Sequence, residues 1–151
     1  MNNSEYKAII TIAVGNEVEA HEFYKGVADK ATDASLKSIF NELAEDELKH
    51  KQLLEGYLNN DLKEMTFNET KDYKITESLP LPELSMDMKY TDAIVLAMKK
   101  EKDAVEMYNK FADASVNEEQ KNIFLELSKM EKGHKAKLED IYNDTAFVEV
   151  W

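Results

Sequence analysis

Apolar side chains recur every three or four residues through long stretches of the chain, the spacing typical of one face of an α-helix. Between residues 36 and 57 this stripe consists of Leu36, Phe40, Leu43, Glu47, His50, Leu54 and Tyr57. A bundle of helices buries such a stripe. The pattern therefore predicts a helix that carries a carboxylate and an imidazole into the core, and this burial needs a physical reason.

The same pattern returns 84 positions later, where Glu131 and His134 repeat Glu47 and His50. Upstream, Glu17 and Glu101 occupy equivalent stripe positions, each seven residues before a tyrosine, Tyr24 or Tyr108. The repeat runs without a gap over residues 10–58 and 94–142. Each half is thus one structural unit, predicted to be a helical hairpin.

Start and stop signals place the four helices at about residues 4–31, 33–59, 91–115 and 117–144. Asp33 and Asn117 are the expected N-caps of the second and fourth helices. Residues 60–90 contain both prolines, Pro80 and Pro82, and are long enough to cross the length of a bundle. We expect one all-α domain over residues 1–151: an antiparallel four-helix bundle of two hairpins, a long crossover and a short tail over 145–151.

Composition narrows the function. The 151-residue chain has no cysteine, which excludes disulfides, thiolate metal ligands and a cysteine nucleophile. Its net charge of −12 argues against nucleic acid or an anionic membrane as partner. The apolar segment at residues 8–14 is too short to span a membrane and lacks a basic leader, so we expect a cytoplasmic protein.

The buried carboxylates and imidazoles are explained by metal. Residues three apart on a helix lie side by side, so Glu47 with His50, and Glu131 with His134, can each reach one ion. Glu17 and Glu101 add one carboxylate from each remaining helix. This is the ligand set of a carboxylate-bridged dinuclear site. Two divalent ions balance four carboxylate charges, whereas unpaired buried charges are costly. His21, one turn after Glu17, is either an additional ligand or a residue flanking the site.

With these motifs the chain resembles the ferritin-like superfamily, and most closely its rubrerythrin-type di-iron domains. The segments that carry the resemblance are GNEVEAHEFY, KKEKDAVEMY, LAEDELKHKQLL and LSKMEKGHKAKL. The resemblance implies two iron ions per chain, bridged by Glu47 and Glu131. It further implies terminal ligands Glu17 and Glu101, and one histidine per iron, His50 and His134. Tyr24 and Tyr108 would then donate hydrogen bonds to ligands, although tyrosines at this spacing are equally consistent with core packing.

The chain departs from the rubrerythrin pattern at three places. Rubrerythrins have a second glutamate three residues after the ligand of the third helix, where this chain has Ala104. They usually carry a cysteine-rich rubredoxin domain as electron donor, which a chain without cysteine cannot form. Residues 146–151 are too few for the fifth helix of ferritin cages.

Two functions remain open at this stage. The first is an oxidoreductase that reduces hydrogen peroxide or dioxygen at a di-iron(II) centre and is re-reduced by an external electron donor protein. The second is an iron-binding or iron-oxidising, ferroxidase-like module without a turnover substrate of its own. Manganese or zinc could also load the site, because carboxylate and imidazole ligands select poorly among these metals. A homodimer is one assembly left open.

The repeat is broken beside the ligands. Asp46 precedes Glu47, whereas Met130 precedes Glu131. Metal-bound imidazoles usually donate their second N–H to an oxygen acceptor. We therefore expect Asp46 to reach across to His134, with His50 left to another partner or to none. The alternative is that Asp46 is simply solvated.

Overall fold

The computed structural model describes residues 2–59, 65–70, 73–75, 81–145, 148 and 150. It contains four α-helices: α1 (Asn3–Lys30), α2 (Ala34–Leu58), α3 (Tyr90–Ala114) and α4 (Glu118–Thr145). Every boundary lies within one residue of its predicted position. Pro80, which the sequence assigned to the crossover, and most of the predicted tail lie outside the described residues.

Local capping explains where α1, α2 and α4 begin, whereas α3 has no side-chain cap at its start. The Asp33 carboxylate accepts a hydrogen bond from the Ser35 amide at 3.0 Å, as expected for the N-cap of α2. The Asn117 side chain accepts one from the Gln120 amide at 2.8 Å, just before α4. At α1, Asn2 and Glu5 form a reciprocal capping box. These contacts satisfy amides that have no partner within the helix.

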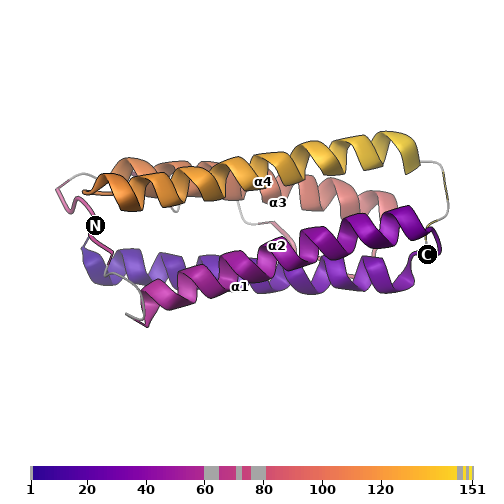
Figure 1. Ribbon diagram of the computed structural model, residues 1–151, viewed down its shortest axis with the longest axis horizontal. Helices are drawn as coiled ribbons and strands as arrows, with labels where there is room; N and C mark the ends of the chain where they lie inside the picture. Colours follow the sequence, from indigo (N-terminus) through magenta and orange to yellow (C-terminus); the bar gives the residue numbers. More distant parts are fainter. Residues whose placement is uncertain are drawn as a thin grey trace.

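The helices pair as two hairpins, α1 against α2 and α3 against α4, which lie against each other as an elongated bundle (Figure 1). The described parts of the crossover between α2 and α3 contact both ends of the bundle. Near its start, Phe67 forms an isolated β-bridge with Ser115 at the turn between α3 and α4. Near its end, Leu84 and Met86 pack against the core at the other end of the bundle.

The core consists of two apolar clusters separated by a polar layer. One cluster lies around Phe40, Ile94 and Leu138, and the other around Ile10, Leu54, Phe111 and Phe124. On every helix the chain passes from one cluster to the other through a buried glutamate or a glutamate–histidine pair. The apolar clusters therefore hold the four helices in register on both sides of this layer.

None of the helices that the structure describes has a stretch long and apolar enough to cross a membrane.

Candidate metal centre

Six polar side chains from all four helices meet in the layer between the apolar clusters. They are Glu17 of α1, Glu47 and His50 of α2, Glu101 of α3, and Glu131 and His134 of α4. All six are buried. The structure thus brings together the six residues that the sequence proposed as ligands of the dinuclear site.

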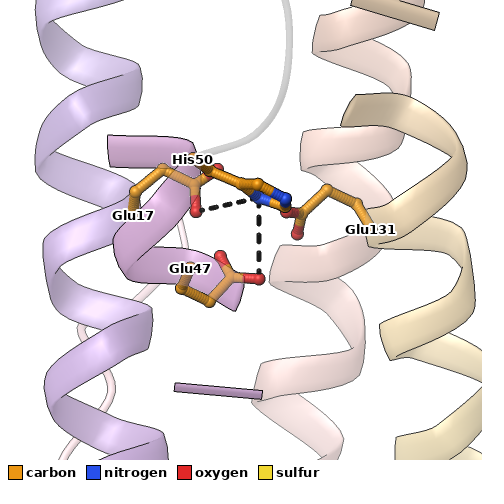
Figure 2. A group of neighbouring side chains, drawn as sticks. All are labelled: Glu17, Glu47, His50 and Glu131. Atoms are coloured by element: carbon orange, nitrogen blue, oxygen red, sulfur yellow. Dashed lines mark ion pairs between the residues drawn. The ribbon is translucent and has the colours of Figure 1, made fainter. Parts of the chain in front are cut away.

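The first group surrounds His50. Its Nδ1 lies 2.6 Å from Oε1 of Glu131, 3.6 Å from Oε2 of Glu17 and 4.0 Å from Oε1 of Glu47. Figure 2 shows the three carboxylates turned toward the imidazole from α1, α2 and α4. One atom from each of the four residues lies within 4.8 Å of the others.

The second group surrounds His134 and mirrors the first. Its Nδ1 lies 2.6 Å from Oε1 of Glu47, 3.9 Å from Oε1 of Glu101 and 4.0 Å from Oε2 of Glu131. Glu47 and Glu131 belong to both groups, whereas each of the other four residues belongs to one. The two imidazole rings are nearly parallel, with centroids 6.0 Å apart.

Each candidate ligand has a buried polar atom that lacks a hydrogen bond of good geometry. Each of the six residues has one buried polar atom with no hydrogen-bond partner among the described residues: Glu17 Oε2, Glu47 Oε1, His50 Nδ1, Glu101 Oε2, Glu131 Oε1 and His134 Nδ1. Four of these atoms form two close contacts of 2.6 Å, His50 Nδ1 with Glu131 Oε1 and His134 Nδ1 with Glu47 Oε1, so in the metal-free layer each imidazole contacts a carboxylate directly. Buried polar atoms without partners are rare and need an explanation. Carboxylate oxygens and imidazole nitrogens that converge in this way fit divalent iron, manganese or zinc.

Without metal, the layer must hold protons. Burial and the neighbouring carboxylates, Glu101 foremost, raise the pKa of Glu47 well above its usual range. Burial and Glu131 do the same for the pKa of Glu101. Burial lowers the pKa of His50, but Glu131 and Glu17 outweigh it and raise that pKa to about 10. Metal ions would therefore displace protons from this layer when they bind.

Both tyrosines donate hydrogen bonds to carboxylates of the layer. The Tyr24 hydroxyl donates to Oε1 of Glu101 at 2.6 Å, and the Tyr108 hydroxyl donates to Oε1 of Glu17 at 2.5 Å. Burial raises the pKa of both phenols well above the usual value, and the acceptor carboxylates add to this effect. The phenols thus remain protonated donors. In each bond the other oxygen of the carboxylate is the one without a partner.

The outer nitrogens of the imidazoles have different partners. His134 Nε2 lies 3.0 Å from Oδ2 of Asp46, which confirms the contact expected from the sequence. His50 Nε2 lies 3.4 Å from Sδ of Met130, a partner that the sequence did not predict. His21 joins neither ligand group among the described residues, and its Nδ1 lies 2.7 Å from the carbonyl oxygen of Ala44.

A cavity of about 220 Å³ lies between α1, α3 and the crossover and reaches the ligand layer. Glu17, Glu47, Glu101 and Glu131 all line it, as does Ala104. Glu19 and Lys100 also line it and form an ion pair. The sequence did not reveal this ion pair. The repeat does not mark it, because the counterpart of Lys100 is the neutral Asn16, and helical spacing does not show contacts between residues on different helices.

Comparison with known proteins places this geometry in a family. A family model described as Rubrerythrin matches residues 8–142. No curated protein matches the chain.

Two solved structures share the fold. A hypothetical protein from Pyrococcus furiosus is 29% identical with a TM-score of 0.72, and the match covers 96% of this chain and 92% of that one. A candidate ferritin-like diiron-carboxylate protein from Thermotoga maritima is 19% identical with a TM-score of 0.68, and the match covers 92% of this chain and 95% of that one. Together with the ferritin-like four-helix bundle and its buried layer of glutamates and histidines, the family match shows that this chain belongs to the rubrerythrin family.

Proposed function

We propose that the chain is a di-iron oxidoreductase that reduces hydrogen peroxide or dioxygen with electrons from an external donor protein. The observation that supports it most directly is the convergence of six buried carboxylate and imidazole side chains from four helices, each with one polar atom that lacks a hydrogen bond of good geometry. Their division into two groups that share two carboxylates matches a dinuclear site.

In this proposal Glu47 and Glu131 bridge the two ions, because each belongs to both groups. Glu17 and His50 complete one position, and Glu101 and His134 complete the other. When bound, two ferrous ions supply the two electrons that reduce peroxide to water.

The surrounding residues position these ligands. Tyr24 and Tyr108 each hold one oxygen of a terminal carboxylate, which leaves its second oxygen directed into the layer. Asp46 accepts from Nε2 of His134, which fixes the tautomer that presents Nδ1 to the metal. The cavity between α1 and α3 gives a small oxidant a path to the ligands. The paired Glu19 and Lys100 supply polar groups in its wall.

Metal analysis and single-turnover kinetics test the proposal. Protein loaded anaerobically with iron should bind two ferrous ions per chain, and mixing with peroxide should oxidise both at the expense of one peroxide. With a continuous supply of reductant, peroxide should be consumed over many turnovers. Glu47→Gln is the matched control for the site. It keeps the volume of the side chain and removes the negative charge of a carboxylate that belongs to both ligand groups. Loaded protein that leaves peroxide and dioxygen unreacted would overturn the assignment.

A second candidate is a ferroxidase-like module, and Ala104 favours it. This alanine lines the cavity at the position where rubrerythrins carry an additional carboxylate. Such a module would oxidise the iron supplied to it without sustained consumption of peroxide under added reductant. Comparing the native chain with Ala104→Glu separates the two. An oxidoreductase limited by the missing carboxylate should turn over faster in the variant, whereas a ferroxidase should gain no sustained turnover.

A further inference from the structure

The two halves of the centre differ most at the outer nitrogen of each imidazole. His134 faces the carboxylate of Asp46, and His50 faces the thioether of Met130. Asp46 and Met130 are equivalent positions of the internal repeat, 84 residues apart. The second half of the repeat therefore has a weak hydrogen-bond acceptor, the Met130 thioether, where the first half has the Asp46 carboxylate. His50 is consequently held less firmly than His134.

Met130 is also accessible from outside. Its exposed fraction is 38%, although it touches the ring of a buried histidine. The other described methionines are buried or only partly exposed: Met65, Met86, Met88, Met98 and Met107. Met130 is thus the most exposed methionine in the described part of the chain.

We propose that Met130 is a site of oxidation by peroxide, and that its sulfoxide strengthens metal binding at the His50 position. A lone pair of the sulfur forms a bond to one peroxide oxygen and the O–O bond breaks. The other peroxide oxygen takes up the proton that the first oxygen carried and leaves as water. The sulfur thus loses two electrons and the peroxide gains them. Methionine sulfoxide reductases reverse this oxidation.

The sulfoxide changes the acceptor that His50 meets. Its S=O oxygen is polar and accepts an N–H far better than the thioether does. Methionine has three rotatable bonds, so an exposed side chain can bring this oxygen to Nε2 of His50. The His50 half would then resemble the half that Asp46 supports. Changes in such supporting partners alter metal affinity by about 10- to 100-fold.

This inference rests on His50 being a ligand, but it does not rest on peroxide reduction. Zinc carries out no redox chemistry, so zinc-loaded protein allows the oxidation to be measured alone. The protein would be treated with increasing hydrogen peroxide, and the sulfoxide at each methionine would be quantified by peptide mass spectrometry. Met130 should be oxidised several-fold faster than the other methionines that the structure describes. A rate equal to theirs would overturn the proposal.

The effect on the site is measured by zinc titration. The weaker of two successive dissociation constants should fall about tenfold after oxidation. Met130→Gln, which offers an amide oxygen in place of the sulfoxide oxygen, should reproduce that gain without peroxide. Met130→Leu is the matched control and should show no gain when treated with peroxide. Because Met130 is exposed, neither variant should disturb the core, and melting curves check this.

Two results of the titration would contradict the proposal. One is an equal gain in oxidised Met130→Leu, which would place the effect at another residue. The other is an unchanged constant in both the oxidised native chain and Met130→Gln. If zinc fails to bind at two positions at all, the dinuclear assignment fails, and that outcome is distinguished by the stoichiometry.

Discussion

At the scale of single residues, two of the buried carboxylates belong to both candidate ligand groups and two belong to one. Glu47 and Glu131 belong to both ligand groups, whereas Glu17 and Glu101 belong to one each. Replacing a shared carboxylate by glutamine keeps its volume but removes a charge from both positions. Glu47→Gln and Glu131→Gln should therefore lose both metal ions in equilibrium dialysis. Glu17→Gln and Glu101→Gln should retain one, and equal losses in all four variants would contradict the bridging roles.

Asp46 offers a test of how the imidazoles are held. Its carboxylate lies 3.0 Å from Nε2 of His134, with a side chain only 35% exposed. We expect the ion at His134 to bind more tightly than the ion at His50. Asp46→Asn keeps an acceptor but removes its charge, so it should weaken the tighter constant about tenfold and narrow the gap between the two. Anaerobic titration measures both constants, and two equal constants in the native chain would sink this prediction.

The sequence predicted these residues unevenly, for physical reasons. Glu17, Glu101 and the two glutamate–histidine pairs were found because helical spacing fixes the face on which a residue lies. Asp46 was found because the two helices that carry the glutamate–histidine motifs were expected to face each other, and a metal-bound imidazole needs an acceptor for its second N–H. The contact of Met130 was missed, because a flexible thioether does not reveal from spacing whether it turns toward the histidine or toward solvent.

At the scale of elements, helix ends were predictable and the crossover was not. Asp33 and Asn117 cap α2 and α4 through contacts within three residues, and such local chemistry is visible in sequence. The crossover is fixed by distant partners. The Gln120 side chain accepts from the Thr66 amide at 2.8 Å and donates to the Thr66 carbonyl at 3.0 Å. No periodic pattern signals such a pairing across 54 residues.

Gln120 therefore provides a prediction about how the crossover is attached to the bundle. Its repeat counterpart is Leu36, so Gln120→Leu inserts the side chain that the other hairpin uses at this position. The variant would leave the Thr66 amide without its partner, whereas the Thr66 carbonyl would keep the hydrogen bond that it accepts from the Val116 amide. Its free energy of unfolding should fall by about 0.5–1.5 kcal/mol, the net contribution of a typical hydrogen bond, because Thr66 is exposed and water can reach the freed amide. Urea denaturation of the zinc-loaded protein measures this, with Glu126→Leu on the exposed face of α4 as control.

An unchanged stability in Gln120→Leu, or an equal loss in Glu126→Leu, would show that the link between Gln120 and Thr66 does not hold the crossover.

At the scale of the whole molecule, the two apolar clusters and the polar layer contribute differently to stability. The clusters lie on both sides of the ligands and do not depend on metal. We therefore expect the metal-free protein to stay folded. Ions that bind only the native layer add stability, because they draw the equilibrium toward the folded state. Metal removal should thus lower the melting temperature without abolishing the cooperative transition.

The size of that decrease should depend on pH, because protons and metal ions compete for the same buried atoms. The pKa of His50 is raised from 6.5 to about 10 in the metal-free protein. The folded state therefore keeps a proton that the unfolded chain releases as pH rises through this window, and stability declines across it. The raised pKa values of Glu47 and Glu101 act in the same direction. Zinc replaces these protons, so the stability of the loaded protein should depend less on pH.

Melting curves of both forms between pH 6.5 and about 9 should show a difference in melting temperature that grows as pH rises. A metal-free melting temperature that stays constant or rises over this range would mean that the layer does not hold its protons as the geometry implies.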